Sequence, residues 1–134
     1  IAELDAYQSE LYPANSNHLV PVSELQKPEA YFVAAMESGV PLGIGCFIRR
    51  GSEYVEIKRV FVPHAARGRG IARAIMNHLE DRARADGYTL ARLETGIYQP
   101  EALALYERLG YARIGRFGHY PDDPVSVFME KRLG

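Results

Sequence analysis

The sequence has little of three features that mark specialised classes of protein. Its one cysteine, Cys46, cannot form an internal disulfide, which favours a reducing, cytoplasmic environment. No apolar run approaches the roughly 20 residues that a transmembrane helix requires, so we expect no membrane span. Charge of one sign is not in excess, because 16 Lys and Arg face 17 Asp and Glu for a net charge of −1. The overall charge therefore does not favour a nucleic acid or an acidic membrane as a partner, and any anion site must come from local clustering.

What is present is typical of one α/β domain. Of the 134 residues, 47% are hydrophobic and 10% are aromatic, which is enough for a core of ordinary size. We find no internal repeat and no low-complexity segment, and we expect residues 1–134 to form a single domain. No two of the 4 histidines have the spacing of metal ligands, so we predict no metal site.

Hydrophobic spacing and turn residues predict the order of the elements. Residues 1–12 have helical spacing and suggest a helix that is already under way at Ile1. The polar residues 13–24 suggest a loop. The predicted order then is three antiparallel strands (30–38, 40–50 and 53–62), a helix (70–86), a strand (88–97), a helix (100–109) and a closing hairpin (111–117 and 125–133). The helix between two of the strands implies a right-handed crossover around residues 62–97.

The junction between the strand 53–62 and the helix that follows it has the composition of an anion site. A helix N-terminus presents unpaired backbone N–H groups and the positive end of the helix dipole. Two glycines let a ligand approach that backbone, and three arginines add guanidinium donors. These residues are Gly68, Gly70, Arg67, Arg69 and Arg73. They predict a phosphate site, with a pyrophosphate as the ligand that suits several arginines.

Other interpretations of the junction compete with this one. The stretch RGRG is also typical of a solvated turn whose arginines pair with Glu80 or Asp81. An RNA-binding interpretation predicts salt-sensitive RNA affinity, which the acidic residues of the chain disfavour. The dinucleotide fingerprint lacks its third glycine, because Arg73 stands there, and no Gly-Lys-Ser/Thr of a phosphate-binding P-loop follows.

At this point the residues resemble a known family. Residues 67–72, RGRGIA, match the R/Q-x-x-G-x-G/A signature of the GNAT acetyltransferases, whose loop and following helix hold the pyrophosphate of acetyl-CoA. Residues 99–111, QPEALALYERLGY, resemble the N-x-x-A-x-x-L-Y-x-x-x-G-F/Y segment of that family, with Gln99 in place of the usual asparagine. The two motifs stand in the right order, and the likeness covers residues 29–132.

The resemblance implies a GNAT-like α/β (α+β) fold, with a mixed, mostly antiparallel central sheet, splayed strands and flanking helices. The family's first strand would lie upstream of Ile1. The activity implied is that of an N-acetyltransferase, which moves an acetyl group from its cosubstrate acetyl-CoA directly to a primary amine of a small molecule or peptide. The residues implied to hold the coenzyme are Val60, Phe61, Val62, Arg67, Gly68, Arg69, Gly70, Ile71, Ala72, Arg73, Gln99 and Ala102.

The resemblance also implies catalytic roles for Glu56 and Tyr106. Glu56 stands where many relatives carry the general base, and Tyr106 matches the tyrosine that acts as general acid toward the thioester sulfur. An N–H near Phe61 or Val62 would stabilise the oxyanion. A bulge in the strand 53–62 would re-aim the side chains that follow it.

The residues themselves leave alternatives to these roles. Glu56 also fits a solvated strand carboxylate paired to Lys58, and Tyr106 a tyrosine of the core. Glu94 is a second candidate for the base, although a strand glutamate beside Arg92 is more often ion-paired, and a water molecule is a third.

The acceptor amine is left open. The resemblance implies that two loops flank the acceptor cleft, and their residues are Asn15, Asn17, His18, His119, Tyr120, Asp122 and Asp123. The two aspartates suit a cationic substrate but are also common turn formers. A non-catalytic acyl-CoA-binding module is the alternative function, and residues 110–132 contain strands that pair across a homodimer in some similar proteins. Cys46 is predicted to be a small buried hydrophobe rather than a nucleophile.

Overall fold

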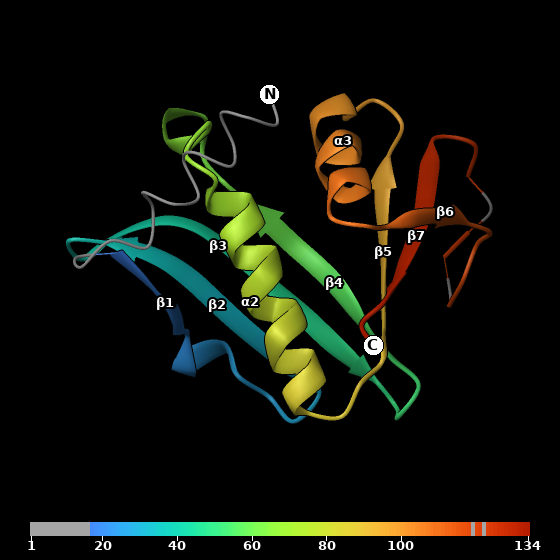
Figure 1. The fold of residues 1–134 in the computed structure, drawn as a ribbon, viewed down its shortest axis with the longest axis horizontal. Coiled ribbons are helices and arrows are strands. Elements are labelled where there is room, and N and C mark those ends of the chain that lie inside the picture. The colour runs from blue at the N-terminus through green and yellow to red at the C-terminus, as the bar shows by residue number, and fades with distance from the viewer. Residues whose placement is uncertain (1–16, 119, 122) are drawn as a thin grey trace.

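One seven-stranded sheet organises the protein (Figure 1). The computed structural model describes residues 17–118, 120–121 and 123–134. The strand order is β1-β2-β3-β4-β5-β7-β6, and every neighbouring pair is antiparallel except β4 and β5. The strands are β1 (Asn17–Pro21), β2 (Ala30–Glu37), β3 (Val40–Arg50), β4 (Tyr54–Phe61), β5 (Leu90–Gly96), β6 (Ala112–Ile114) and β7 (Ser126–Arg132). The predicted mixed, mostly antiparallel sheet is therefore confirmed.

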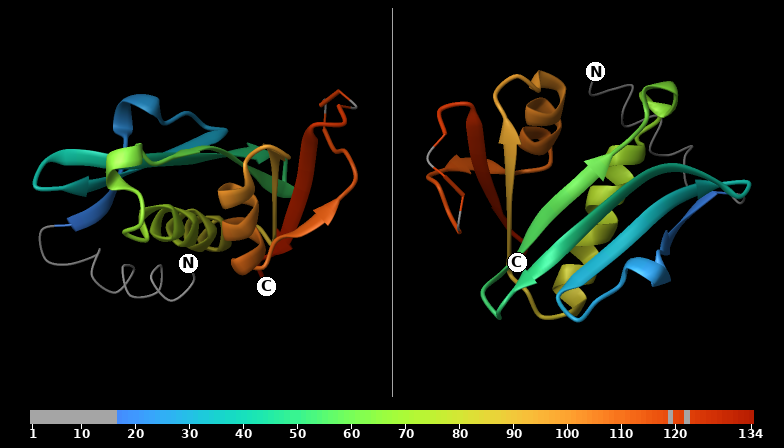
Figure 2. Two further views of the ribbon diagram at one scale, coloured as in Figure 1. Left: turned by 90° about the horizontal axis from the view of Figure 1, so that it is seen from above. Right: turned by 180° about the vertical axis from the view of Figure 1, so that it is seen from behind.

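In the described part of the chain, two α-helices stand where the sequence predicted helices. Helix α2 (Ile71–Ala85) joins β4 to its parallel neighbour β5, and α3 (Pro100–Arg108) joins β5 to β6. Short 3-10 turns, η1 (Ser23–Leu25) and η2 (His64–Ala66), precede β2 and α2. Figure 2 shows α2 and α3 next to each other on the same side of β2, β3 and β4. Within the described ranges, no helix is long and apolar enough to cross a membrane.

Two segments differ from the prediction, and a third cannot be compared. Residues 17–21 were predicted as loop but form β1, because pairing with β2 uses backbone groups and does not need an apolar strand pattern. Strand β6 is shorter than the predicted 111–117, since only residues 112–114 pair with β7. The helix predicted for residues 1–12 lies outside the described residues.

Strand β4 carries the bulge that the family resemblance implied. Its residue Phe61 pairs with Ile44, whereas Lys58 pairs with Cys46, so three steps along β4 face two along β3. Arg59 supplies the irregular backbone with a φ of 55°. A bulge of this kind increases local twist and turns the strand end in a new direction.

After Ile57, just before the bulge, β4 separates from β5. The parallel pairing covers only residues 55–57 of β4 and 91–93 of β5, after which the two strands diverge toward their carboxyl ends (Figure 1). The opening lies at the end of β4 from which the chain enters the loop before α2. The fold thus places the predicted anion site and the splayed strands side by side.

Two glycines of β3 let α2 pack closely on the sheet. A Cβ built on Gly45 would lie 2.5 Å from Cγ2 of Ile75, and one on Gly43 would lie 3.1 Å from Cδ1 of the same side chain. Ile75 is fully buried. A side chain at either glycine would therefore push the helix outward, so these residues set the distance between α2 and the strands.

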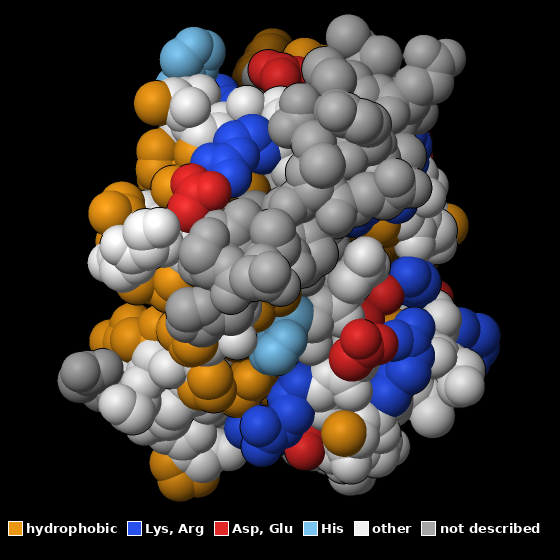
Figure 3. All heavy atoms as spheres, turned by 60° about the vertical axis from the view of Figure 1, so that its left-hand side comes forward, with side chains coloured by type: hydrophobic (Ala, Val, Ile, Leu, Met, Phe, Trp, Pro, Cys, Tyr) orange, Lys and Arg blue, Asp and Glu red, His pale blue; other side chains and the backbone are white. Residues whose placement is uncertain are grey.

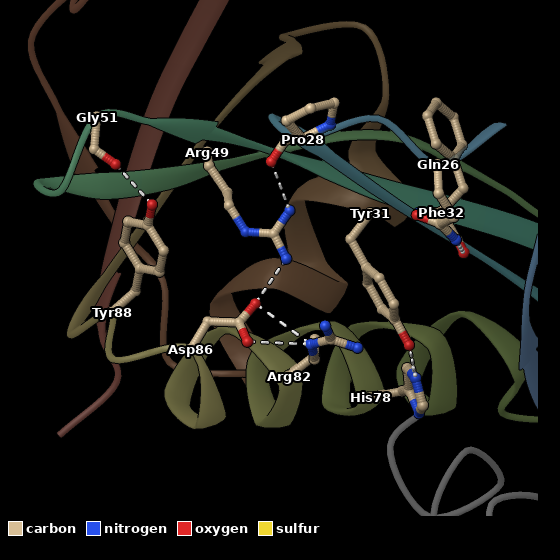
Figure 4. A network of polar contacts seen from close by, with 10 residues as sticks. All are labelled: Gln26, Pro28, Tyr31, Phe32, Arg49, Gly51, His78, Arg82, Asp86 and Tyr88. Carbon is tan, nitrogen blue, oxygen red and sulfur yellow. Dashed lines mark hydrogen bonds and ion pairs between the residues drawn. The ribbon is translucent and has the colours of Figure 1, made fainter. Parts of the chain in front are cut away.

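Polar contacts tie the far end of α2 to the sheet (Figure 4). Arg49 of β3 donates to Asp86 at 2.6 Å, and Arg82 donates to the same carboxylate at 3.1 Å. One turn earlier along the helix, the hydroxyl of Tyr31 lies 2.9 Å from Nε2 of His78. The C-terminal half of α2 is held by these contacts as well as by the core.

Cys46 behaves as the sequence predicted. Its side chain is fully buried in β3, and it is a free cysteine. Burial raises the pKa of the Cys46 thiol to about 11, so the thiol stays protonated at neutral pH. This protonation state suits a packing residue and not a nucleophile.

Candidate functional site

A cavity of about 690 Å³ lies where β4 leaves β5, with α2 and α3 in its wall. All of the predicted coenzyme residues except Arg69 line it, namely Val60, Phe61, Val62, Arg67, Gly68, Gly70, Ile71, Ala72, Arg73, Gln99 and Ala102. The proposed acid Tyr106 lies in the same wall. The tertiary structure therefore brings together the two sequence motifs, which lie about 30 residues apart in the chain.

The start of α2 is open to an anion. Gly70 is the N-cap with a φ of 75°, and Gly68 has a φ of 82°, both in the left-handed region that favours glycine. No side chain caps the helix, and no acidic residue stands in its first turn. The first N–H groups of α2 and the positive end of its dipole thus remain available at the cavity wall.

The three arginines of the loop do not act as one cluster. The Nε of Arg67 donates to the carbonyl oxygen of Val62 at 3.1 Å, which fixes the loop to the end of β4. Arg69 lies outside the cavity lining and makes two hydrogen bonds to Glu37 of β2, at 2.9 and 2.7 Å. The Nε of Arg73 is buried and has no hydrogen-bond partner among the residues that the structure describes, although its side chain lines the cavity.

The unpaired Nε of Arg73 bears on whether the site suits the coenzyme. A buried donor without a partner is unfavourable by about 1–3 kcal/mol, and a guanidinium at a cavity wall is a strong donor to phosphate oxygens. The open helix N-terminus lies at the same wall. The residues present therefore fit a diphosphate-bearing ligand.

The alternative interpretations of the loop receive less support. Glu80 is held by Tyr111 at 2.9 Å and Lys131 at 2.7 Å, and Asp81 pairs with Arg84 at 2.9 Å, so the arginines of the loop are not their partners. On the face drawn in Figure 3, Lys and Arg side chains stand next to Asp and Glu side chains. Such alternation disfavours an extended basic surface for RNA.

The C-terminal part of β4, on the edge that faces β5, offers backbone groups to an extended ligand. Among the described strands, β5 pairs with β4 only as far as Ile57, so the edge formed by residues 58–62 faces the opening. Phe61 is 55% exposed there. An edge of this kind pairs with the amides of an extended molecule, such as a pantetheine arm, in the manner of an added strand.

Tyr106 of α3 has the environment of a proton donor. It lines the cavity, and its ring centroid lies 6.0 Å from that of Tyr111. Burial raises the pKa of the Tyr106 hydroxyl, so the group is protonated at neutral pH. The residue is therefore partly a packing residue, as its alternative interpretation held, and also faces the site.

Glu56 is buried beneath the splay and not solvated. Its exposure is 2%, and Arg50 donates to Oε1 at 2.9 Å through both Nε and a terminal nitrogen. Lys58 lies 3.9 Å from Oε2, so the expected pairing with Lys58 exists, but the solvated environment does not. Glu56 is not among the residues that line the cavity.

Tyr120, from the loop between β6 and β7, donates a hydrogen bond to Oε2 of Glu56. Burial raises the pKa of Tyr120, and the hydrogen bond to Glu56 raises it further. The sequence placed Tyr120 in a loop beside the acceptor cleft but gave no sign of this contact, because 64 residues separate the two partners. Only the return of the chain along β7 brings them together.

The remaining candidates are Glu94 and the loop residues considered for the acceptor cleft. Arg92 pairs with Glu130 at 3.0 Å and not with Glu94. The Asp123 carboxylate accepts from the N–H of Val125 at 3.0 Å, which is the turn role considered for it. Asn15, His119 and Asp122, and the side chains of Asn17 and His18, lie outside what the structure describes.

Comparisons with known proteins all point to acyl-CoA-dependent acyltransferases. A model of the Acetyltransferase (GNAT) family matches residues 2–111. An IAA acetyltransferase from Azospirillum brasilense is 47% identical over 134 residues, which is 99% of this chain and 88% of that protein. A solved structure from Klebsiella pneumoniae, described as an acyl-CoA N-acyltransferase, is 35% identical with a TM-score of 0.78, over 99% of this chain and 86% of that one. A GNAT acetyltransferase from Elizabethkingia anophelis with acetyl-CoA bound shares the fold at 14% identity and a TM-score of 0.73, over 88% of this chain and 99% of that chain.

Proposed function

Because the chain belongs to the GNAT acetyltransferase family, with acetyl-CoA as its cosubstrate, we propose that it transfers the acetyl group to a primary amine of a small molecule or peptide. The observation that carries the proposal is the cavity between β4 and α3, whose wall contains the open N-terminus of α2. In this proposal, a thioester ligand in the cavity lies beside Tyr106 of its wall, and Glu56 on β4 takes the proton of the amine.

In this proposal the coenzyme is held mainly by backbone groups. The N–H groups at the start of α2 and the guanidinium of Arg73 bind the diphosphate. The free edge at residues 58–62 of β4 pairs with the amides of the pantetheine arm. Gln99 and Ala102 of the second motif line the opposite wall. Arg69 was also predicted to join this group, and its guanidinium makes hydrogen bonds to Glu37 of β2.

The chemistry needs a proton acceptor and a proton donor. Glu56 serves as general base, and its carboxylate is held in place on β4 by the ion pairs with Arg50 and Lys58. Tyr106 serves as general acid, because its hydroxyl stays protonated in the cavity wall and can donate to the departing thiolate. The amine attacks the thioester carbonyl carbon directly, the C–N bond forms, and the C–S bond breaks.

A thiol-release assay with acetyl-CoA over a panel of amines tests the activity and the acceptor together. Glu56→Gln and Tyr106→Phe are expected to lower kcat by at least tenfold, while CoA affinity measured by calorimetry stays within twofold. If CoA binds but no amine releases thiol, the chain is a non-catalytic acyl-CoA-binding module. The engagement of both Glu56 oxygens by Arg50 and Tyr120 is the observation that keeps this second function in view.

The coenzyme site is tested by a matched pair of glycine variants. Gly70→Val places a side chain on the left-handed N-cap of α2 and is expected to weaken CoA binding by at least tenfold. Gly39→Val introduces the same side chain at a φ of 80° in the β2–β3 turn, outside the cavity wall. The second variant reports the effect of backbone strain alone, so equal CoA affinity in the two variants would refute the loop assignment.

A further inference from the structure

Both oxygens of Glu56 are already engaged. Oε1 accepts from Arg50 at 2.9 Å, and Oε2 accepts from the hydroxyl of Tyr120. Since the Glu56 side chain is 3% exposed, an amine that approaches from solvent meets other groups before it meets this carboxylate. The proposed base therefore lacks a direct route to the proton that it must take.

The group that contacts Oε2 of Glu56 is the Tyr120 hydroxyl. It gives its hydrogen to Glu56, which leaves the oxygen lone pairs free to accept. Lys58 already uses one of them, because its Nζ lies 3.4 Å from the Tyr120 oxygen. The Lys58 side chain is 35% exposed, so this contact lies at a partly solvent-exposed position. It shows that the Tyr120 oxygen accepts a hydrogen bond from a nitrogen while its own hydrogen goes to Glu56.

Aromatic packing fixes the Tyr120 ring in that position. Its centroid lies 5.6 Å from the ring of Phe117 and 5.5 Å from the ring of Phe128, both in edge-to-face geometry. Phe117 packs in turn against Tyr54 of β4, at 5.8 Å. The hydroxyl is therefore held by a cluster that spans β4, β7 and the β6–β7 loop.

We propose that Tyr120 is a catalytic residue, which accepts the proton of the acceptor amine while it passes its own hydroxyl proton to Glu56. The proposal rests on the proposed acetyl transfer. As the amine nitrogen bonds to the acetyl carbon, its N–H proton moves to the Tyr120 oxygen, and the Tyr120 proton moves to Oε2 of Glu56. The C–S bond breaks, the thiolate takes the proton of Tyr106, and exchange with solvent restores Tyr106 and Glu56.

The charges around Tyr120 suit a neutral relay. It faces Arg50 from β3, Glu56 and Lys58 from β4, and Glu94 from β5. In its own loop, Arg116 donates to the Tyr120 carbonyl at 3.4 Å. Burial and the two carboxylates keep the pKa of Tyr120 above its usual range, so the tyrosine does not lose its proton except as it gains another.

Two hydroxyl deletions in the same aromatic cluster test the relay. Tyr120→Phe keeps the ring and removes the hydroxyl that contacts Glu56. Tyr54→Phe removes a hydroxyl from the neighbouring ring on β4 and serves as the control. With acetyl-CoA and the most active amine of the panel, we expect Tyr120→Phe to lower kcat by 10- to 100-fold with the KM for acetyl-CoA within twofold. The control should stay within twofold in both constants.

Two readouts separate a relay from a packing role. If both residues act on one proton path, Tyr120→Phe/Glu56→Gln should be no slower than the slower single variant, since effects within a unit are not additive. In mixtures of H₂O and D₂O, the wild-type rate should depend on the deuterium fraction through two protons, and the Tyr120→Phe rate through one. Multiplicative losses in the double variant, or an unchanged isotope dependence in Tyr120→Phe, overturn the relay.

The outcomes for the two proposals differ. A Tyr120→Phe protein with wild-type kcat overturns the relay and leaves the proposed acetyl transfer intact. A wild-type protein that binds CoA but releases no thiol with any amine overturns the acetyl transfer, and the relay with it. Thermal melting of each variant within about 2 °C of wild type shows that the comparison is made between folded proteins.

Discussion

The two glycines of β3 give a sharp test of how the site is built. Alanine at Gly45 would place its Cβ 2.5 Å from Cγ2 of Ile75, 3.3 Å from Cδ1 of Leu79 and 3.4 Å from Cγ2 of Val60. Carbon atoms in good contact are about 3.5–4.0 Å apart, so α2 must move outward by about 1 Å at this point. Ile75 cannot rotate away easily, because a β-branched side chain in a helix has one strongly preferred χ1 rotamer.

The expected loss of stability follows from this overlap. Overpacking of a core by one methyl group destabilises by about 1–3 kcal/mol, and we expect Gly45→Ala to lie in that range. Ile75→Ala alone should destabilise by about 2–5 kcal/mol, because it leaves a cavity under α2. The double variant should be more stable than the sum predicts by about 1–2 kcal/mol, since the new Cβ occupies space that Ile75 has vacated.

Urea unfolding followed by far-UV circular dichroism gives the three free energies of unfolding. Gly115→Ala is the matched control, because nothing lies within 4 Å of a Cβ at that position, and its effect should stay within about 0.5 kcal/mol. If Gly45→Ala is as stable as wild type, or if the two substitutions are strictly additive, close packing of α2 on β3 does not depend on this glycine. Gly45→Ala should also weaken CoA binding, since Val60 and the start of α2 lie in the cavity wall.

Two further predictions concern the polar contacts of α2. Asp86→Asn should lower the free energy of unfolding by about 1 kcal/mol at pH 7, because it removes a carboxylate shared by Arg49 and Arg82. Burial opposes ionisation of Asp86, but the hydrogen bonds from both arginines hold its pKa below the usual range. The stability that the Asp86 carboxylate contributes is therefore present above about pH 4 and is lost at lower pH. If Asp86→Asn lowered the free energy of unfolding equally at pH 7 and pH 3 in urea titrations, this origin would be contradicted. Burial also lowers the pKa of His78, which means that the unfolded chain binds this proton more readily and that stability falls as pH drops below about 6.5. Thermal melts between pH 7 and pH 5.5 should show this decrease in wild type and a smaller one in His78→Gln, and parallel curves would rule the histidine out.

The local elements of the fold could be predicted from the sequence, with one clear exception. Glycine and proline positions and the 3.6-residue apolar spacing located α2 and α3 to within a residue or two, and alternation located the long strands. Strand β1 was missed because an edge strand is defined by its backbone pairing with β2, and polar residues with a proline at the end hide it. The bulge at Arg59 came from the family resemblance and not from any local signal.

The sequence by itself determined the open N-terminus of α2, because Gly68 and Gly70 encode its left-handed start through short-range backbone geometry. It also located Glu56 and Tyr106 on the elements that carry them. Only the tertiary structure decided what each side chain meets. Arg69 pairs with a residue 32 positions away, and Tyr120 reaches Glu56 across 64 positions. Such contacts depend on strand order and on the return of β7 beside β5, which no local pattern of residues specifies.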